Sequence, residues 1–141
     1  MEEARSFPMI PPPSPVPLSA PSGEIVIRTI AMPADTNANG DIFGGWLMSQ
    51  MDLGGAIMAR NTARGRVVTV AVDGMSFVSP VAIGDIVTCY ARVVAIGRTS
   101  MKIDVEAWAQ NFKTGEQRRV TEGVFTYVAI DDAGKPTAIV R

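Results

Sequence analysis

One apolar helical segment among several strand-forming runs is the feature that most constrains the fold of this chain. Residues 46–60 carry apolar residues and glycines at the spacing of one helix face: Leu47, Met51, Gly54, Gly55 and Met58. A β-branched run, 24–31, precedes this segment. Four further runs with strand character follow it: 66–78, 85–96, 99–110 and 117–130. Short, turn-rich connections between the later runs indicate antiparallel pairing.

The run 99–110 shows how its strand should lie in a sheet. Its apolar side chains fall on one face and its charged side chains on the other: Met101, Ile103, Val105 and Ala107 against Lys102, Asp104 and Glu106. Five strands and one helix have one economical arrangement, in which the sheet curves and its concave face covers the helix. We therefore predict an α+β fold, with a five-stranded curved antiparallel sheet wrapped around one long central helix that is buried on most sides.

The proline content divides the chain into a tail and a domain. Seven of the ten prolines lie in the first 22 residues, a composition that favours extended conformers and gains little from burial. We predict a flexible tail over 1–22, with a docking peptide for another protein as the alternative. The remaining residues, 23–141, suffice for one domain.

Charge and hydropathy exclude several classes of partner. The net charge of -1 offers no basic field for nucleic acid. No apolar run approaches the length that spans a membrane, and Glu2 and Glu3 stand where a signal peptide needs positive charge. We therefore expect no nucleic-acid or membrane partner and a cytoplasmic location.

The absence of histidine limits the chemistry available to the chain. With no histidine in the sequence, triads with a His base and zinc sites built on His are excluded. The single cysteine, Cys89, lies in a predicted strand, where a thiol usually serves as a small buried hydrophobe. An enzyme of this composition depends on carboxylates, amides and backbone N–H groups.

Asp52 is the carboxylate that stands out, because it lies in the middle of the apolar helix. Its neighbours three and four positions away are small or apolar: Met48, Ser49, Gly55, Ala56 and Ala59. A carboxylate that loses solvation in this way is typical of a general base or nucleophile. The alternative is a carboxylate that faces water or pairs with an arginine.

Two glycine pairs flank Asp52 and strengthen the functional interpretation. Gly54 and Gly55 inside the helix suggest close packing against another backbone. Gly44 and Gly45, expected in the loop just before the helix, suggest that the chain there approaches another group closely. Free N–H groups at a helix start can stabilise a developing oxyanion.

Two long motifs carry a family resemblance. The segment 32–57, MPADTNANGDIFGGWLMSQMDLGGAI, and the segment 65–87, GRVVTVAVDGMSFVSPVAIGDIV, closely resemble the YciA-like acyl-CoA thioesterases of the hot-dog superfamily. The similarity covers about 24–140. It implies a hot-dog thioesterase domain that hydrolyses acyl-CoA to free acid and CoA, with no metal and no cofactor.

The resemblance also implies roles for individual residues. Asp52 would be general base or nucleophile, Asn37 its polar partner, and the Gly45 N–H would polarise the thioester carbonyl. Asn39 and Asp41 match the same loop, and Phe43 and Gly44 adjoin it at the substrate. Because a thiol has a pKa near 8.5, the leaving thiolate needs no strong general acid.

CoA phosphates need cationic or N–H partners. The candidates lie in two short segments of the chain: Arg64, Arg66, Arg98, Thr99 and Ser100. The resemblance favours the turn 98–100 for the CoA arm.

The last expectations concern the oligomer that the chain forms and the alternatives to a thioesterase. Hot-dog subunits generally pair edge to edge, so the resemblance implies a dimer. It also implies a site that takes Asn37 and Asp52 from different chains of that dimer. The resemblance to YciA-like proteins further implies a trimer of dimers. A hot-dog dehydratase is disfavoured, because those enzymes use a histidine. A non-catalytic acyl-CoA binding module is the runner-up, and a purely structural oligomer is a third alternative.

Overall fold

The computed structural model describes residue 10 and residues 20–140 of the chain. Within this part, the elements are five strands, one α-helix and one short 3-10 helix. In chain order they are β1 (Glu24–Ile30), η1 (Pro33–Asp35), α1 (Gly44–Ala63), β2 (Val67–Asp73), β3 (Ile86–Ile96), β4 (Ser100–Gln110) and β5 (Gln117–Ala129). The predicted order of one strand, one long helix and four strands is confirmed.

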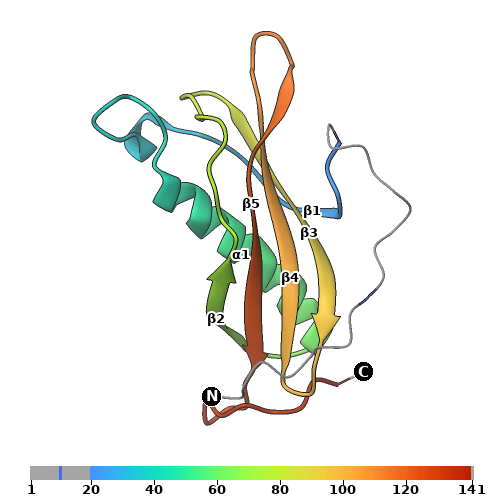
Figure 1. Ribbon diagram of the computed structural model, residues 1–141. Coiled ribbons are helices and arrows are strands. Elements are labelled where there is room, and N and C mark those ends of the chain that lie inside the picture. Colours follow the sequence, from blue (N-terminus) through green and yellow to red (C-terminus); the bar gives the residue numbers. More distant parts are fainter. Residues whose placement is uncertain (1–9, 11–19, 141) are drawn as a thin grey trace.

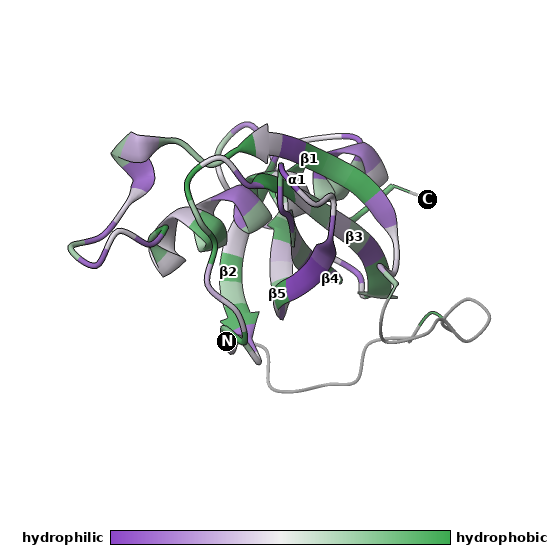
Figure 2. Cartoon of the chain, turned by 90° about the horizontal axis from the view of Figure 1, so that it is seen from above, coloured by the Kyte–Doolittle hydropathy of each residue, from purple (hydrophilic) through white to green (hydrophobic). Residues whose placement is uncertain are grey.

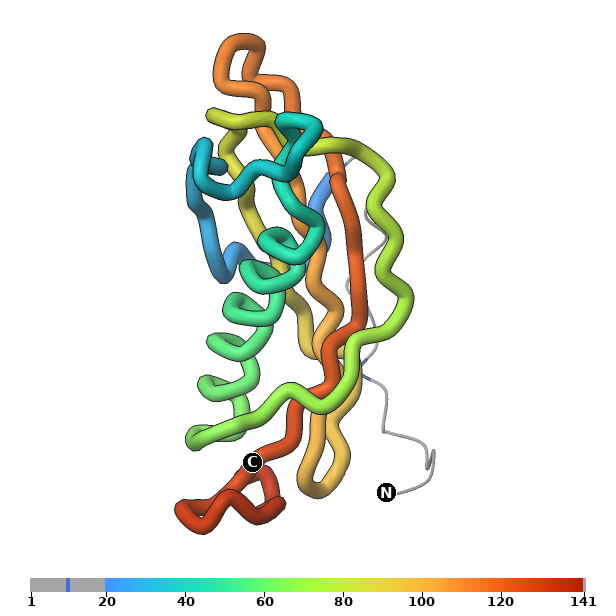
Figure 3. Tube along the Cα trace, turned by 90° about the vertical axis from the view of Figure 1, so that its left-hand side faces the viewer, coloured from blue at the N-terminus to red at the C-terminus, as the bar shows by residue number. Residues whose placement is uncertain are grey.

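The strands form a single antiparallel sheet in the order β1-β3-β4-β5-β2. α1 packs along one face of this sheet, as Figures 1 and 3 show from two sides. The core lies between the helix and the sheet and includes Met51 from α1, Ile103 from β4 and Phe125 from β5. The predicted fold class is therefore confirmed, with β1 and β2 as the two edge strands.

Two glycines allow α1 to lie close to the sheet. A Cβ on Gly54 would lie 2.6 Å from Cγ2 of Val26 in β1, and a Cβ on Gly55 would overlap the hydroxyl of Tyr127 in β5. Real Cβ contacts are not that short, so larger residues would push the helix away from the sheet. The predicted close packing of this pair is confirmed, although the neighbours are side chains of β1 and β5 rather than another backbone.

The helix is longer than predicted at both ends. α1 covers residues 44–63 rather than 46–60, so Gly44 and Gly45 form its first turn instead of the end of a loop. At its other end Arg64 adopts a left-handed φ of 57° and donates its N–H to Arg60 O at 2.8 Å, an arrangement that stops a helix.

β2 is shorter than predicted. Its pairing with β5 stops at Asp73 rather than at Val78. Gly74 follows with a φ of +73°, a conformation that glycine adopts readily and that turns the chain out of the strand. Residues 74–85 then form an irregular connection to β3.

The charged face of β4 is not open to solvent, contrary to the half-buried strand that its alternation predicts. Asp104 and Glu106 do point away from the helix, yet they are only 6% and 5% exposed. Trp108 Nε1 donates to Glu106 Oε1 at 2.8 Å, and Ser22 N–H reaches the same oxygen at 3.4 Å. Both faces of this central strand are therefore covered.

The helix is not buried on most sides in the single chain. Large apolar side chains of α1, of β2 and of the segment after β2 remain exposed: Leu53 57%, Ile57 41%, Val68 41%, Val70 56%, Phe77 47% and Val78 68%. We call these six residues the apolar surface. Figure 2 shows the hydrophobic colouring of β2 at the sheet edge, beside the helix. Large apolar side chains that remain exposed in this number are typical of interaction sites.

The predicted flexible tail, 1–22, lies mostly outside the described residues. Within the described part, Ile10 N–H donates to Val94 O of β3 at 2.9 Å. Over the described ranges, no helix is both long and apolar enough to cross a membrane.

Candidate active site

Asp52 lies in the middle of α1 on the side that faces β2 and β5, and it is half-buried. Thr69 Oγ1 from β2 donates to Asp52 Oδ1 at 2.7 Å. Tyr127 from β5 donates its phenol O–H to the same Oδ1 at 3.0 Å and to the backbone oxygen of Asp52 at 2.9 Å. The carboxylate is thus held by hydroxyl donors and pairs with no arginine among the described residues, which removes the salt-bridge alternative.

The local structure explains why these donors reach Asp52. The register of β2 against β5 shifts between Thr69 and Ala71, an irregularity of the type that re-aims side chains at strand edges. Gly55, one turn from Asp52, leaves room for the Tyr127 hydroxyl. Thr69 and Tyr127 did not figure among the predicted site residues. A tyrosine in the core strand 117–130 was the available signal, since a buried phenol usually finds a partner.

Tyr127 is held in its protonated form. Burial raises the pKa of its phenol well above the usual range, and the charge of Asp52 and the hydrogen bond to it raise this pKa further. The phenol therefore remains a hydrogen-bond donor throughout the pH range in which a protein of this kind works.

Asn37 organises the loop between β1 and α1. Its Oδ1 accepts the N–H groups of Asn39 at 2.8 Å and Asp41 at 3.1 Å, and its own N–H donates to Asp41 O. A bridge between Thr36 and Ile42 closes the loop. None of the hydrogen bonds of the described residues joins Asn37 to Asp52.

The start of α1 offers free N–H groups. The helix begins after Phe43, which gives no side-chain cap, and the N–H groups of Gly44 and Gly45 find no acceptor among the described residues. A Cβ on Gly44 would meet the ring of Phe77 at 3.2 Å, whereas a Cβ on Gly45 would meet nothing within 4 Å. Phe43 itself is 48% exposed. The space beside Gly45 is therefore open in the single chain.

The arginine candidates for CoA lie at the other end of the helix. Arg64 and Arg66 follow α1, and Arg98 lies in the turn between β3 and β4, with all three exposed. The end of β5 joins these segments, because Ile130 N–H donates to Arg66 O at 3.0 Å and Ala129 N–H donates to Thr99 O at 2.8 Å. Figure 3 shows both segments at the lower end of the molecule, opposite the loop that carries Asn37.

The turn itself is compact. Gly97 N–H donates to Ser100 O at 2.7 Å, and Ile139 N–H donates to Arg98 O at 2.8 Å, which ties the C-terminal segment to this turn. The end of β5 thereby brings the turn 98–100 close to the segment that carries Arg66. Neither segment is brought to Gly45, which lies about 28 Å of helix away from Arg64 at 1.5 Å per residue.

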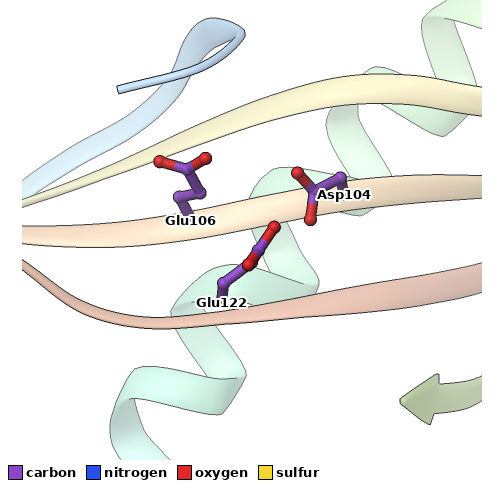
Figure 4. Close-up of side chains that lie close together, drawn as sticks. All are labelled: Asp104, Glu106 and Glu122. Atoms are coloured by element: carbon purple, nitrogen blue, oxygen red, sulfur yellow. The ribbon is translucent and has the colours of Figure 1, made fainter. Parts of the chain in front are cut away.

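A second group of acids lies on the opposite face of the sheet. Asp104, Glu106 and Glu122 offer carboxylate oxygens within 4.8 Å of one another, and Figure 4 shows Asp104 and Glu122 turned toward each other from β4 and β5. The pKa of Asp104 is raised to about 8, above all by burial and then by a hydrogen bond to Glu122 and the charges of Glu122 and Glu106, while the charge of Arg92 acts in the opposite direction. Asp104 therefore keeps its proton near neutral pH.

These carboxylates are the described residues best suited to hold a hard cation. Arg92 stands across from Asp104 in the β3–β4 pairing and already brings a positive charge to the cluster. Among the described residues, Asp104 Oδ1 and Arg92 Nε lack hydrogen-bond partners. The proton on Asp104 and the charge of Arg92 together offset the like charges, so the arrangement has a structural explanation without an ion.

Cys89 takes no part in the site. It is fully buried in β3, and burial raises the pKa of its thiol to about 12. The thiol thus stays protonated, and the prediction of a small buried hydrophobe is confirmed.

Comparison with known proteins assigns the family. The model described as "Thioesterase superfamily" matches residues 39–115, more than half of the chain. The Escherichia coli "Acyl-CoA thioester hydrolase YciA" is 58% identical over 124 residues, which cover 86% of this chain and 94% of that protein. The chain therefore belongs to the thioesterase superfamily.

Solved structures agree with this assignment. The hexameric thioesterase y2039 from Yersinia pestis is 61% identical with a TM-score of 0.83, over 86% of this chain and 100% of the other. The hexameric hotdog fold thioesterase Cj0915 of Campylobacter jejuni is 45% identical with a TM-score of 0.80, over 84% and 91% of the two chains. The hot-dog fold and the thioesterase class that the motifs predicted are confirmed.

Proposed function

We propose that this thioesterase hydrolyses acyl-CoA to a free carboxylic acid and CoA, with Asp52 as the reacting carboxylate. The observation that carries the proposal is a half-buried carboxylate in the middle of an apolar helix, oriented by two hydroxyl donors. The Escherichia coli relative is named an acyl-CoA thioester hydrolase, which supports the substrate class.

Asp52 has two chemical routes open to it. It can take a proton from a water that attacks the thioester carbonyl, or it can attack the carbonyl itself to give an anhydride that water then hydrolyses. In both routes the C–S bond breaks, the thiolate leaves with the electron pair and takes up a proton, and the oxygen of water ends in the free acid. A thiol pKa near 8.5 makes this departure possible without a strong general acid.

The Gly45 N–H is the proposed donor to the carbonyl oxygen of the thioester. It lies in the first turn of α1, where N–H groups are free and the helix dipole favours negative charge. Asp52 lies seven residues further along, about 10 Å at 1.5 Å per residue. The open space at the Gly45 Cα would allow a thioester to approach the backbone between these two groups.

Asn37 is the proposed second donor, and it would act from another subunit. Its Oδ1 is occupied by two N–H groups of its own loop, so only its NH2 group remains to bind substrate or water. Because this loop lies beyond the start of α1 and makes no hydrogen bond to Asp52, a single chain lacks a complete site. A second copy would supply the missing amide.

The apolar surface is where we expect that second copy. β2 is an edge strand with free backbone groups on one side, and both β2 and α1 carry large apolar side chains that are exposed in the single chain. Pairing through β2 would cover both features and would seal Asp52, which is tied to β2 through Thr69, away from bulk water. We propose a dimer of this kind and, since two solved relatives are hexamers, a trimer of such dimers.

The phosphates of CoA would lie at the arginine end. Arg64, Arg66 and Arg98 place three exposed guanidinium groups on segments that the end of β5 joins, and Thr99 and Ser100 add hydroxyl groups. Guanidinium groups bind phosphate through paired N–H donors. Asn39 and Asp41 stabilise the Asn37 loop, and Phe43 lies exposed beside Gly44 for contact with the acyl group.

Hydrolysis of a panel of acyl-CoA esters, C2 to C16, tests the proposal. Purified protein and Asp52→Asn are compared for thiol release, with CoA binding measured in parallel and Asp132→Asn, an exposed acid in a loop, as the matched control. We expect Asp52→Asn to bind CoA but to lose at least about 100-fold in kcat, the scale of a lost acid–base group.

The runner-up is a non-catalytic acyl-CoA binding module. It would be supported if the protein and both variants bound CoA equally and none released thiol from any ester. A cytoplasmic location and chemistry without a metal or separate cofactor remain parts of the proposal.

A further inference from the structure

The two hydroxyl donors at Asp52 converge on one of its oxygens. Thr69 Oγ1 and the Tyr127 phenol both donate to Oδ1, at 2.7 and 3.0 Å. Oδ2 has no hydrogen-bond partner among the described residues. The carboxylate is therefore asymmetric, with one oxygen occupied by donors and the other available to a molecule in the site.

We propose that Tyr127 is a positioning residue that holds Asp52 Oδ1 and thereby makes Oδ2 the oxygen that takes the proton of water or attacks the thioester. This inference rests on the function proposed above. An oxygen that already accepts two hydrogen bonds is a poorer base and nucleophile than one that accepts none, because each donor stabilises negative charge on the atom it contacts.

The hydroxyl of Tyr127 is the part of the side chain that this role requires. The ring already packs in the core beside Phe125, with ring centroids 6.4 Å apart, and a phenylalanine would keep that packing. The hydroxyl instead reaches α1, where it contacts both the backbone oxygen and Oδ1 of Asp52. One O–H thus fixes the side chain to the helix that carries it.

Gly55 leaves the space in α1 that the Tyr127 hydroxyl occupies. A Cβ at position 55 would overlap the Tyr127 oxygen and would lie 3.1 Å from Cζ of the ring. Glycine in a helix interior costs about 1 kcal/mol relative to alanine. The clash is therefore with the phenol oxygen above all, and it would be largely relieved in a chain that carried phenylalanine at position 127.

Tyr127 also keeps its proton beside a carboxylate. Burial raises the pKa of the phenol above its usual range, and the charge of Asp52 raises it further. The donor is consequently present at every pH at which the enzyme is assayed, and the Tyr127 proton itself does not shape the pH profile.

Tyr127→Phe tests the inference, with Tyr90→Phe as the matched control, since Tyr90 is the only other tyrosine. We expect Tyr127→Phe to lower kcat by about 10- to 100-fold, the worth of one hydrogen bond to a charged group, with KM changed less than about twofold. The acidic limb of kcat/KM against pH should move to higher pH, because removal of a donor favours the protonated carboxyl. Tyr90→Phe should match the unaltered protein in all three quantities.

A merely structural role would give a different result. If Tyr127→Phe lowers the thermal midpoint while kcat per folded subunit and the acidic limb stay as in the unaltered protein, the positioning role is wrong. Failure of the proposed function is separable from this outcome, because the unaltered protein would then release no thiol from acyl-CoA, and both proposals would be overturned.

A second pair of variants keeps the test independent of the stability of Tyr127→Phe. Gly55→Ala should displace the hydroxyl and lower kcat to a similar degree, although the new methyl favours the helix. In the Tyr127→Phe background the same substitution should add less than about a twofold further loss, since the hydroxyl is already gone. Independent, multiplying losses from the two substitutions would overturn the inference.

Discussion

Asp104→Asn should remove a pH dependence of stability that the acid cluster imposes. The pKa of Asp104 is raised from 3.8 to about 8, first by burial and then by Glu122. Between these two pH values the folded state holds a proton that the unfolded state releases. This contribution to stability is thus fully present below about pH 4 and is lost as the pH rises through 8, with linkage setting the sign.

The size of the effect follows from the same shift. The free energy of unfolding cannot change by more than about 1.4 kcal/mol per pH unit for one proton, so its loss across pH 5 to 9 amounts to a few kcal/mol. For a chain of this length, that corresponds to a fall of the order of 10 °C in the thermal midpoint. Asn keeps the shape of Asp104 and an N–H donor to Glu122, so the variant should fold and should show a flat profile in this window.

Thermal unfolding between pH 5 and 9.5 measures how the stability of the unaltered protein and of Asp104→Asn depends on pH. Glu122→Gln should give an intermediate slope, because it removes the nearest like charge but leaves Asp104 buried. Glu116→Gln, an exposed acid of the β4–β5 turn, serves as the control and should follow the unaltered protein. Parallel profiles for the unaltered protein and Asp104→Asn between pH 5 and 9 would refute the reasoning.

Three further substitutions test other parts of the structure. Gly54→Ala should destabilise the protein by about 1–3 kcal/mol in urea unfolding, because its Cβ has no room. Gly45→Ala should keep the stability of the unaltered protein but lose activity, because the added methyl group blocks the approach of substrate to the backbone. Equal stability of the two variants would contradict the packing account. Val70→Lys should dissociate the subunits, as measured by light scattering, and abolish activity, because it buries a charge at the proposed interface. Val140→Lys, at another exposed valine, should do neither. Arg98→Ala should raise KM for acyl-CoA several-fold and weaken its dependence on salt, with kcat nearly unchanged; an unaltered KM would remove this arginine from the CoA site.

The sequence was sufficient for the elements that local pattern controls. Strand alternation and the helix spacing predicted the α+β fold, and Gly54 and Gly55 predicted close packing in the middle of α1. Cys89 in a strand was expected to be buried, and it is. These features depend on neighbours within one or two turns, which a single sequence shows directly.

Long-range features were not accessible in the same way. Tyr127 is 75 positions from Asp52, and Thr69 is 17 positions away, so only the closed sheet reveals that both donate to one oxygen. The alternation of β4 predicted an open charged face, yet Asp104 and Glu106 are covered, because strand period specifies the face and not what lies over it. The proposed role of the Asn37 loop likewise depends on a second subunit, which the pattern of one sequence does not show.

A mixing experiment tests most directly the central claim that Asp52 works in a site completed by another chain. Asp52→Asn and Asn37→Ala, each with strongly reduced activity alone, are co-expressed with different tags, and the mixed dimers are purified and assayed for acyl-CoA hydrolysis. A site shared across a two-fold interface leaves one of the two sites intact in each mixed dimer, so the purified mixed dimers should show about half of the unaltered activity per dimer. If both residues act within one chain, every site in the mixed dimer carries one defect, and activity that stays at the level of the single variants would contradict the account.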